Sequence, residues 1–279
     1  LHDIYKNHSM AALFLALFVC AITVFLCICA YKYDNKYTFI GPQASKGVLS
    51  LNDSDIENHP VMILADGWEY YHNRLLTPED ITTGLNIPNE YIYLGAYGGF
   101  ESGNPEQSPH GSATYRLTIK VPETPRQYTL ELPEIFSAYR AYINGSLAAE
   151  LGNPDPDHYS PQTLNRTTSF EAGGSIDILI AVSDFSHLYS GFVYPPAFGK
   201  PDAVSHVLNM RFLFRAALCT VALTIGFLAI LIGILSRRSK TAVLYGLLCL
   251  FFVGYISYPI VKTFVSSYYP FYALENLSF

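Results

Sequence analysis

Cysteine is absent from the polar middle of this 279-residue sequence. All five cysteines lie in apolar runs toward the two ends of the chain, namely Cys20, Cys27, Cys29, Cys219 and Cys249. The middle therefore has no disulfide framework and must be held together by a hydrophobic core. No cysteine spacing typical of a zinc site occurs either.

Basic residues are scarce in the same part of the chain. Residues 31–210 carry 21 acidic and 10 basic side chains, a net charge of −11. A surface of this charge repels nucleic acid and anionic membranes. We therefore expect no nucleic-acid partner.

Motifs of enzymes and of metal sites are missing as well. The sequence has no G-x-S-x-G, no H-E-x-x-H and no P-loop. Asp155, Asp157 and His158 cluster in one loop, but this loop lacks the glycine and the final glutamate of an EF-hand. We expect no catalytic site, no metal and no cofactor in these residues.

Long apolar runs, in contrast, occur three times. Residues 10–30 form a run of 21 residues, and residues 216–235 and 241–260 form two runs of 20. About 20 apolar residues cross the roughly 30 Å of hydrocarbon in a bilayer, so each run predicts a transmembrane helix in contact with lipid. Small or helix-bending residues of the later runs are expected to allow close helix approach and a bend, although they are also ordinary residues of membrane helices: Gly226, Gly233, Gly254 and Pro259. The transmembrane helices also offer a contact for a homodimer.

The first run resembles both a signal anchor and a cleaved signal peptide. The apolar region of a cleaved peptide usually spans about 7–15 residues and ends before a small-x-small site. This run is longer, and no Ala-x-Ala follows it. An uncleaved signal anchor is therefore favoured.

Basic residues in a short loop orient these helices. Arg237, Arg238 and Lys240 lie in the loop 236–240, and short basic loops stay on the cytoplasmic side. Lys32 and Lys36 argue weakly for the opposite orientation, but long domains cross the membrane largely regardless of such charges. The predicted order is a cytoplasmic N-terminus (1–9), a signal anchor (10–30), an extracellular sensor domain (31–210), a transmembrane helix (211–235), a cytoplasmic loop (236–240), a transmembrane helix (241–262) and the extracellular start of a next connection (263–279).

The junction between the extracellular domain and the second apolar run is predicted to be stiff. Residues 199–209 contain few flexible residues. Arg211 and Arg215 follow, and we expect them to extend from the outer mouth of the helix toward the membrane interface.

Period-two alternation dominates the segment between the apolar runs. Apolar and polar side chains alternate in residues 114–121 and 175–182, which is typical of half-buried strands. Asn144-Gly145 separates two more such stretches, and this pair tolerates the positive φ angles of a type I′ turn. The pattern predicts an all-β antiparallel sandwich of jelly-roll type, joined to α-helical transmembrane segments.

Four stretches carry a resemblance to a known family: GWEYYHNRLLTPED (67–80), GSATYRLTI (111–119), LPEIFSAYRAYINGSLAAELGNPDPD (132–157) and AVSDFSHLYSGFVYPPAFGKPDAV (181–204). They resemble bacterial seven-transmembrane receptors with diverse intracellular signalling modules, over about residues 60–262. The resemblance implies an extracellular sandwich that binds a small molecule such as a carbohydrate. It also implies spans that signal to a cytoplasmic module, often a histidine kinase of a two-component system. The strand before the Asn-Gly turn is similar to galactose-binding-like sandwiches beside glycosidase domains.

The chain departs from this family in its length. It ends at Phe279, after the second of the presumed seven spans, and it begins with Leu1. We interpret it as the N-terminal sensing and membrane part of a sensor of the bacterial cell membrane, with the output module outside these residues. The alternative is a membrane-anchored carbohydrate-binding or adhesion module without signalling output.

Aromatic and planar polar side chains in the sandwich are the candidate ligand contacts. Sugar-binding proteins stack sugars on aromatic rings and hold hydroxyl groups with such polar groups. The candidates are Trp68, Tyr71, Arg116, Arg140, Tyr142, Tyr159, Arg166, His187 and Tyr189. Structural roles remain open for all of them, because strand aromatics usually pack in a core and strand arginines often pair with acidic neighbours.

Overall fold

The computed structural model of the chain describes residues 10, 13–14, 17–28, 31, 40–84, 86–95, 100, 106, 108–133, 135, 137–186, 191–236 and 239–264. The chain forms two compact units, Leu1–Asn35 and Lys36–Phe279. In the first unit, Leu17–Ile28 is an apolar helix whose large hydrophobic side chains are exposed. This helix covers the middle of the run predicted as a signal anchor.

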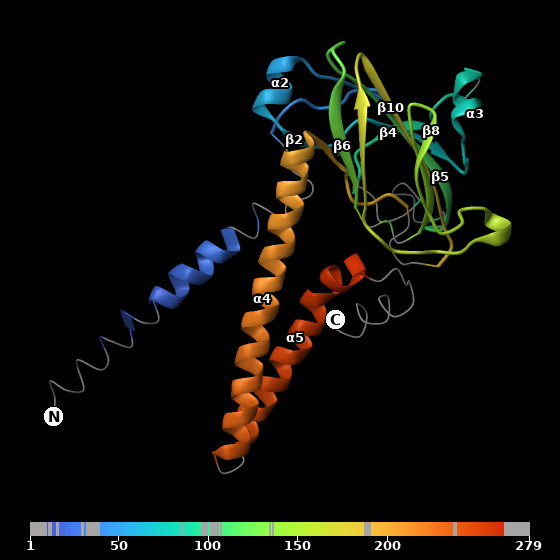
Figure 1. The fold of residues 1–279 in the computed structure, drawn as a ribbon. Coiled ribbons are helices and arrows are strands. Elements are labelled where there is room, and N and C mark those ends of the chain that lie inside the picture. The colour runs from blue at the N-terminus through green and yellow to red at the C-terminus, as the bar shows by residue number, and fades with distance from the viewer. Residues whose placement is uncertain are drawn as a thin grey trace. The chain divides into compact units, whose positions relative to one another are not determined.

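Two β-sheets form most of the second unit before its C-terminal helices (Figure 1). The larger sheet has seven strands in the order β4-β3-β5-β10-β7-β8, with β1 paired to β5, and the smaller has the order β2-β11-β6-β9. The strands are β1 (Val48–Ser50), β2 (Val61–Ile63), β3 (Trp68–His72), β4 (Glu90–Ile92), β5 (Gly111–Lys120), β6 (Arg126–Leu132), β7 (Ala138–Ile143), β8 (Ser146–Leu151), β9 (Arg166–Ala172), β10 (Ser175–Asp184) and β11 (Ala197–Gly199). Short helices connect them: α2 (Asp53–Asn58), α3 (Pro78–Thr82) and the 3₁₀ turn η1 (Pro156–His158).

Strand β5 shows how the alternating sequence builds the sandwich. Tyr115, Leu117 and Ile119 are nearly fully buried and enter the core. Arg116 and Thr118, which alternate with them, lie on the opposite face because successive side chains of a strand point to opposite sides. The core lies between the two sheets, where apolar side chains of β6 join those of β5 and β10. The predicted β-sandwich is confirmed.

The Asn-Gly turn connects β7 and β8 as the sequence predicts. Asn144 has a φ of 50° and Gly145 a φ of 79°, so both central residues have the positive φ of a type I′ turn. The register of the hairpin shifts between Ala141 and Tyr142, which marks a β-bulge.

Strand β1 departs from the predicted antiparallel arrangement. It pairs with β5 in parallel, with Val48 opposite Thr118 and Ser50 opposite Lys120, whereas the other strand pairs are antiparallel. The strand order establishes a two-sheet sandwich and does not establish a jelly roll.

Helix α4 (Pro201–Leu235) begins directly after β11 and Lys200. Proline suits the first helical position because its φ is fixed near the helical value, and Asp202 in the first turn complements the helix dipole. At 1.5 Å per residue, the 35 residues span about 50 Å. Residues 201–210, which the sequence assigns to the extracellular domain, form the first turns of this helix.

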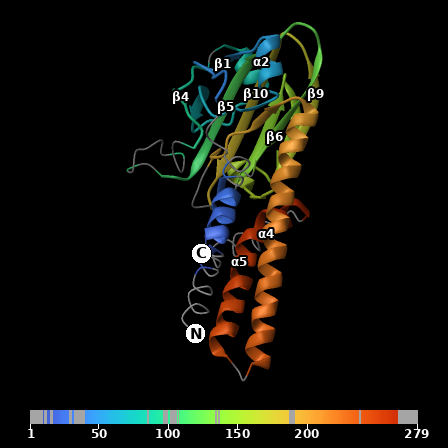
Figure 2. The ribbon, with the colours of Figure 1, turned by 90° about the vertical axis from the view of Figure 1, so that its left-hand side faces the viewer.

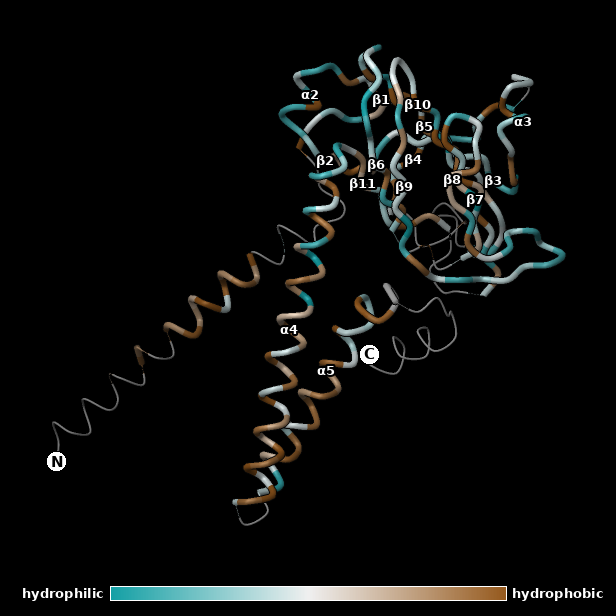
Figure 3. The backbone as a smooth tube through the Cα atoms, viewed as in Figure 1, coloured by the Kyte–Doolittle hydropathy of each residue, from teal (hydrophilic) through white to brown (hydrophobic). Residues whose placement is uncertain are grey.

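Helix α5 (Lys240–Phe264) packs along α4. Among the described residues, α4 and the part of α5 up to Val261 are long and apolar enough to cross a membrane, by length and composition. Figure 3 shows that apolar residues dominate α5 and the part of α4 beside it, whereas the end of α4 next to the sandwich is mixed.

Glycines bring α4 and α5 into close contact. A Cβ on Gly246 would lie 2.5 Å from Cγ1 of Ile230 and 2.7 Å from the carbonyl oxygen of Gly226. A Cβ on Gly233 would lie 2.6 Å from Cγ2 of Val243. The close approach predicted at Gly226 and Gly233 is therefore present. Gly254 has no such role among the described residues, since no atom there lies within 4 Å of where its Cβ would be.

Candidate functional site

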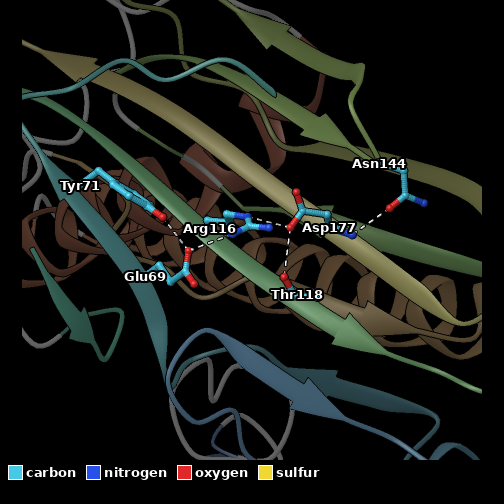
Figure 4. A network of polar contacts seen from close by, with 6 residues as sticks. All are labelled: Glu69, Tyr71, Arg116, Thr118, Asn144 and Asp177. Carbon is cyan, nitrogen blue, oxygen red and sulfur yellow. Dashed lines mark hydrogen bonds and ion pairs between the residues drawn. The ribbon is translucent and has the colours of Figure 1, made fainter. Parts of the chain in front are cut away.

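A polar network centred on Arg116 lies on the outer face of the seven-stranded sheet, opposite the core (Figure 4). Its Nε donates to Oδ1 of Asp177 at 2.9 Å, and its Nη1 donates to Oε2 of Glu69 at 3.4 Å. The hydroxyl of Tyr71 donates to the same Glu69 oxygen at 2.8 Å, and that of Thr118 donates to Asp177 at 3.1 Å. Strands β3, β5 and β10 thus each contribute to one connected group.

Burial and neighbouring charges keep two groups of this network protonated, the guanidinium of Arg116 and the hydroxyl of Tyr71. Burial alone would lower the pKa of Arg116, but the carboxylates of Asp177 and Glu69 outweigh it and hold that pKa above its usual value. Burial, followed by the hydrogen bond to Glu69, raises the pKa of Tyr71, so its hydroxyl stays a donor. One guanidinium faces two carboxylates, which leaves the group with one net negative charge.

Asn144 links the hairpin turn to this network. Its side-chain oxygen accepts from the backbone N–H of Asp177 at 2.8 Å (Figure 4). The backbone N–H of Asn144 donates to the Asp177 carbonyl oxygen at 2.9 Å. Asn144 therefore serves both the turn geometry and the neighbouring strand. Sequence reasoning missed Glu69 and Asp177 as members of the network, although each lies at an outward-facing position of an alternating strand.

Arg140 makes a separate ion pair farther along the same face. Its Nε donates to Oε1 of Glu150 at 2.7 Å, and both side chains are about two-fifths exposed. The structure thus gives both strand arginines acidic partners. Tyr142, two residues after Arg140, is half-buried.

The candidate aromatics of β3 are buried. Trp68 is 0% exposed, donates from Nε1 to the Leu64 carbonyl oxygen at 2.7 Å, and packs edge-on against Phe192. Tyr71 is 2% exposed. Because both rings are buried, neither presents an open face for stacking on a ligand in this conformation.

The remaining candidates lie elsewhere. Tyr159 donates to Oδ1 of the buried Asp184 at 3.2 Å. Asp184 is the last residue of β10, whereas Asp177 lies near the start of that strand. Burial raises the pKa of Tyr159. Arg166 is exposed at the start of β9. His187 and Tyr189 lie outside the described residues. Of the described candidates, the structure brings Tyr71 and Arg116 together through Glu69, and it places the others elsewhere.

A buried ion pair joins the sandwich to α4. Arg211 of α4 lies 3.7 Å from Oε2 of Glu131 on β6, and their side chains are 11% and 4% exposed. Tyr128 and Leu130 of β6 enter the core, so Glu131 lies on the outer face of the smaller sheet. Figure 2 shows α4 running beside β6. Arg211, predicted to lie at the outer mouth of the second span, contacts Glu131 of the sandwich.

Comparison with known proteins gives structural matches at low similarity. No family model and no curated protein matches the chain, so the resemblance to receptors rests on the quoted residues alone. The GH2 β-galacturonidase of Eisenbergiella tayi is 12% identical, over 59% of this chain and 26% of that one, with a TM-score of 0.34. The β-glucuronidase of Ruminococcus gnavus is 14% identical, over 51% and 28%, with a TM-score of 0.36. That of Faecalibacterium prausnitzii is 13% identical, over 52% and 32%, with a TM-score of 0.35.

The chain spans less than a third of each of these three enzymes. The two long apolar helices follow the sandwich. Any ligand of this sandwich has to be inferred from its own side chains.

Proposed function

We propose that this chain is the sensing and membrane part of a bacterial signal-transduction receptor. In this proposal the sandwich lies outside the cell and binds a small molecule such as a carbohydrate. The helices α4 and α5 cross the membrane and pass the binding event inward. The output module, a histidine kinase in the receptors that the sequence resembles, lies outside these 279 residues.

The continuity of α4 is the observation that carries this proposal. Its first turns pack on β6 and β11, and its last 20 residues are apolar and pair with α5. One uninterrupted helix therefore extends from the sandwich surface into the segment that fits a bilayer. Since a helix transmits displacement along its axis better than a flexible linker, a shift at the sandwich reaches the membrane segment.

The buried ion pair supports this coupling. A buried carboxylate is costly unless it is paired. Glu131 therefore favours positions of α4 that keep Arg211 close to it. A ligand changes the balance between two positions of α4 only by its difference in affinity for them. A sheet that moves on ligand binding would in this way move the helix with it.

Site-directed labelling tests the topology that the proposal requires. The native cysteines are replaced by alanine, and single cysteines are introduced at Ser146, exposed in the β7–β8 hairpin, and at Ser236, exposed after α4. We expect a membrane-impermeant maleimide to label S146C in intact cells and S236C only after permeabilisation. The opposite pattern would refute an extracellular sensor, and labelling of both in intact cells would refute a membrane crossing by α4.

A further inference from the structure

A pocket opens where two strands share one edge of β5. On that edge, the pairing of β3 with β5 stops at Glu69, which lies opposite Arg116. The pairing of β1 with β5 starts at Val48, which lies opposite Thr118. Leu117 lies at the gap between the two strands. The pocket at this gap has a volume of about 170 Å³.

The pocket has an apolar floor and a polar rim. Core side chains form the floor, and Gln43, Asp66 and Tyr93 contribute polar groups from three separate segments. The full lining is Pro42, Gln43, Ala44, Leu49, Ile63, Leu64, Ala65, Asp66, Tyr93 and Leu117. Oδ1 of Asp66 accepts from the N–H of Gly67 at 2.8 Å, which fixes this carboxylate at the pocket wall.

Close backbone contacts build the wall of this pocket. Gly67 has a φ of 70°, and a Cβ there would lie 2.5 Å from the carbonyl oxygen of Ala44. The N–H of Gly47 donates to the Gly67 carbonyl oxygen at 2.8 Å. The segment before β1 is therefore held against the connection between β2 and β3 by contacts that only glycine permits.

Size and polarity together indicate the class of ligand. A cavity of about 150 Å³ holds one benzene ring, so this pocket of about 170 Å³ has room for the ring of one sugar unit, with its hydroxyl groups at the open side. A sugar ring has an apolar C–H face and a rim of hydroxyl groups, which matches an apolar floor under amide, carboxylate and phenol groups. Asp66 and the net charge of −11 over residues 31–210 disfavour anions.

We propose that this pocket binds a single neutral or amino sugar ring. The proposal deepens the proposed function and rests on it only for the consequence of binding. The proposed ligand site is thus this pocket and not the outer face of the large sheet. On that face Arg116 and Arg140 are already paired with carboxylates.

The pocket is directly connected to α4. Ile63 of the pocket wall lies opposite Ala197 of β11, and the N–H of Leu64 donates to the Pro196 carbonyl oxygen at 2.9 Å. Strand β11 is followed by Lys200, whose N–H donates to the Pro60 carbonyl oxygen, and then by α4. A ligand that shifts the wall formed by β2 therefore acts on the strand that leads into the helix.

Binding of three sugars to the whole chain in nanodiscs tests this inference. The probes are glucose, glucosamine and glucuronate, measured by calorimetry on the unchanged chain and on Asp66→Asn. Asparagine keeps an oxygen for the N–H of Gly67 but removes the charge, and Asp157→Asn on the exposed turn η1 is the matched control. Thermal unfolding without sugar checks that each variant is folded.

We expect saturable binding of glucose and glucosamine, and binding of glucuronate that is weaker by about tenfold or more. D66N should weaken glucosamine binding about tenfold and reduce the difference in affinity between glucosamine and glucuronate. D157N should change neither of these quantities. The inference is overturned by equal binding of glucose and glucuronate, by binding that D66N leaves unchanged, or by no saturable binding of any probe. If no sugar binds to the pocket, the cysteine-labelling pattern is still the expected one. If the labelling pattern contradicts the receptor topology, the sugar titrations still show binding. The two proposals therefore fail in different experiments.

Discussion

Replacing Arg211 with methionine should destabilise the sandwich and release the first turns of α4 from it. The substitution leaves the carboxylate of Glu131, 4% exposed, buried without its guanidinium. Breaking a buried pair in this way costs about 3 kcal/mol of unfolding free energy. Urea unfolding of the chain in nanodiscs measures the loss, because Trp68 is the single tryptophan and lies in the sandwich core.

The control for this effect is an arginine of β6, the strand that carries Glu131. Arg126 begins β6 and pairs with Asp53 at the surface, where the two side chains are 35% and 66% exposed. R126M should change the unfolding free energy by only about 0.5 kcal/mol. Combining R211M with Glu131→Leu should recover part of the lost stability, because no charge then stays buried. Equal losses for R211M and R126M would show that the junction contributes no more than a surface pair.

Replacing Gly246 with leucine should separate α4 from α5. Even a Cβ at this position would lie 2.5 Å from Ile230 and 2.7 Å from the Gly226 backbone oxygen, so a whole side chain forces the helices apart. Overpacking of this kind costs about 1–3 kcal/mol. Unfolding of the helices in an SDS titration, followed by circular dichroism, measures the loss.

Gly254 of the same helix provides the matched control. No described atom lies within 4 Å of where its Cβ would be, so G254L adds the same side chain in open space. Its midpoint in SDS should match that of the unchanged chain. A loss as large as that of G246L would mean that leucine itself, and not helix contact, causes the effect.

The long strands could be predicted from sequence because their information is local. Alternation in β5 and β10 identifies both the strands and the side that faces the core. The Asn-Gly pair identifies the hairpin through its positive φ angles. Strands β1, β2, β4 and β11 have three residues each, too few to show a period, and they were missed.

The start of α4 was missed because its first turns are polar on the side away from the sheet. The signals of a helix start are nevertheless present, since Pro201 and Asp202 occupy the first turn. Hydropathy alone detects the later apolar run and assigns the preceding residues to the sandwich. A search for helix starts upstream of each apolar run would have placed this boundary.

The contacts of the candidate site depend on strand register, which no short stretch of sequence contains. Arg116 is singled out by its position in an apolar strand, but its partners come from β3 and β10, 47 and 61 residues away. The pair between Glu131 and Arg211 likewise needs α4 to lie on the outer face of the smaller sheet. The pocket at the gap between β1 and β3 arises from two strands that share one edge of β5.

Amide hydrogen exchange over residues 204–215 of the chain in nanodiscs tests the central claim, which is that α4 and the sandwich form one mechanical unit. The account predicts that these amides exchange as slowly as those of β5 and β10, because this part of α4 is docked on β6 and held by Arg211. Exchange as fast as that of the short exposed helix α3 would contradict it. The sandwich would then be tethered by a frayed linker that cannot transmit a binding event.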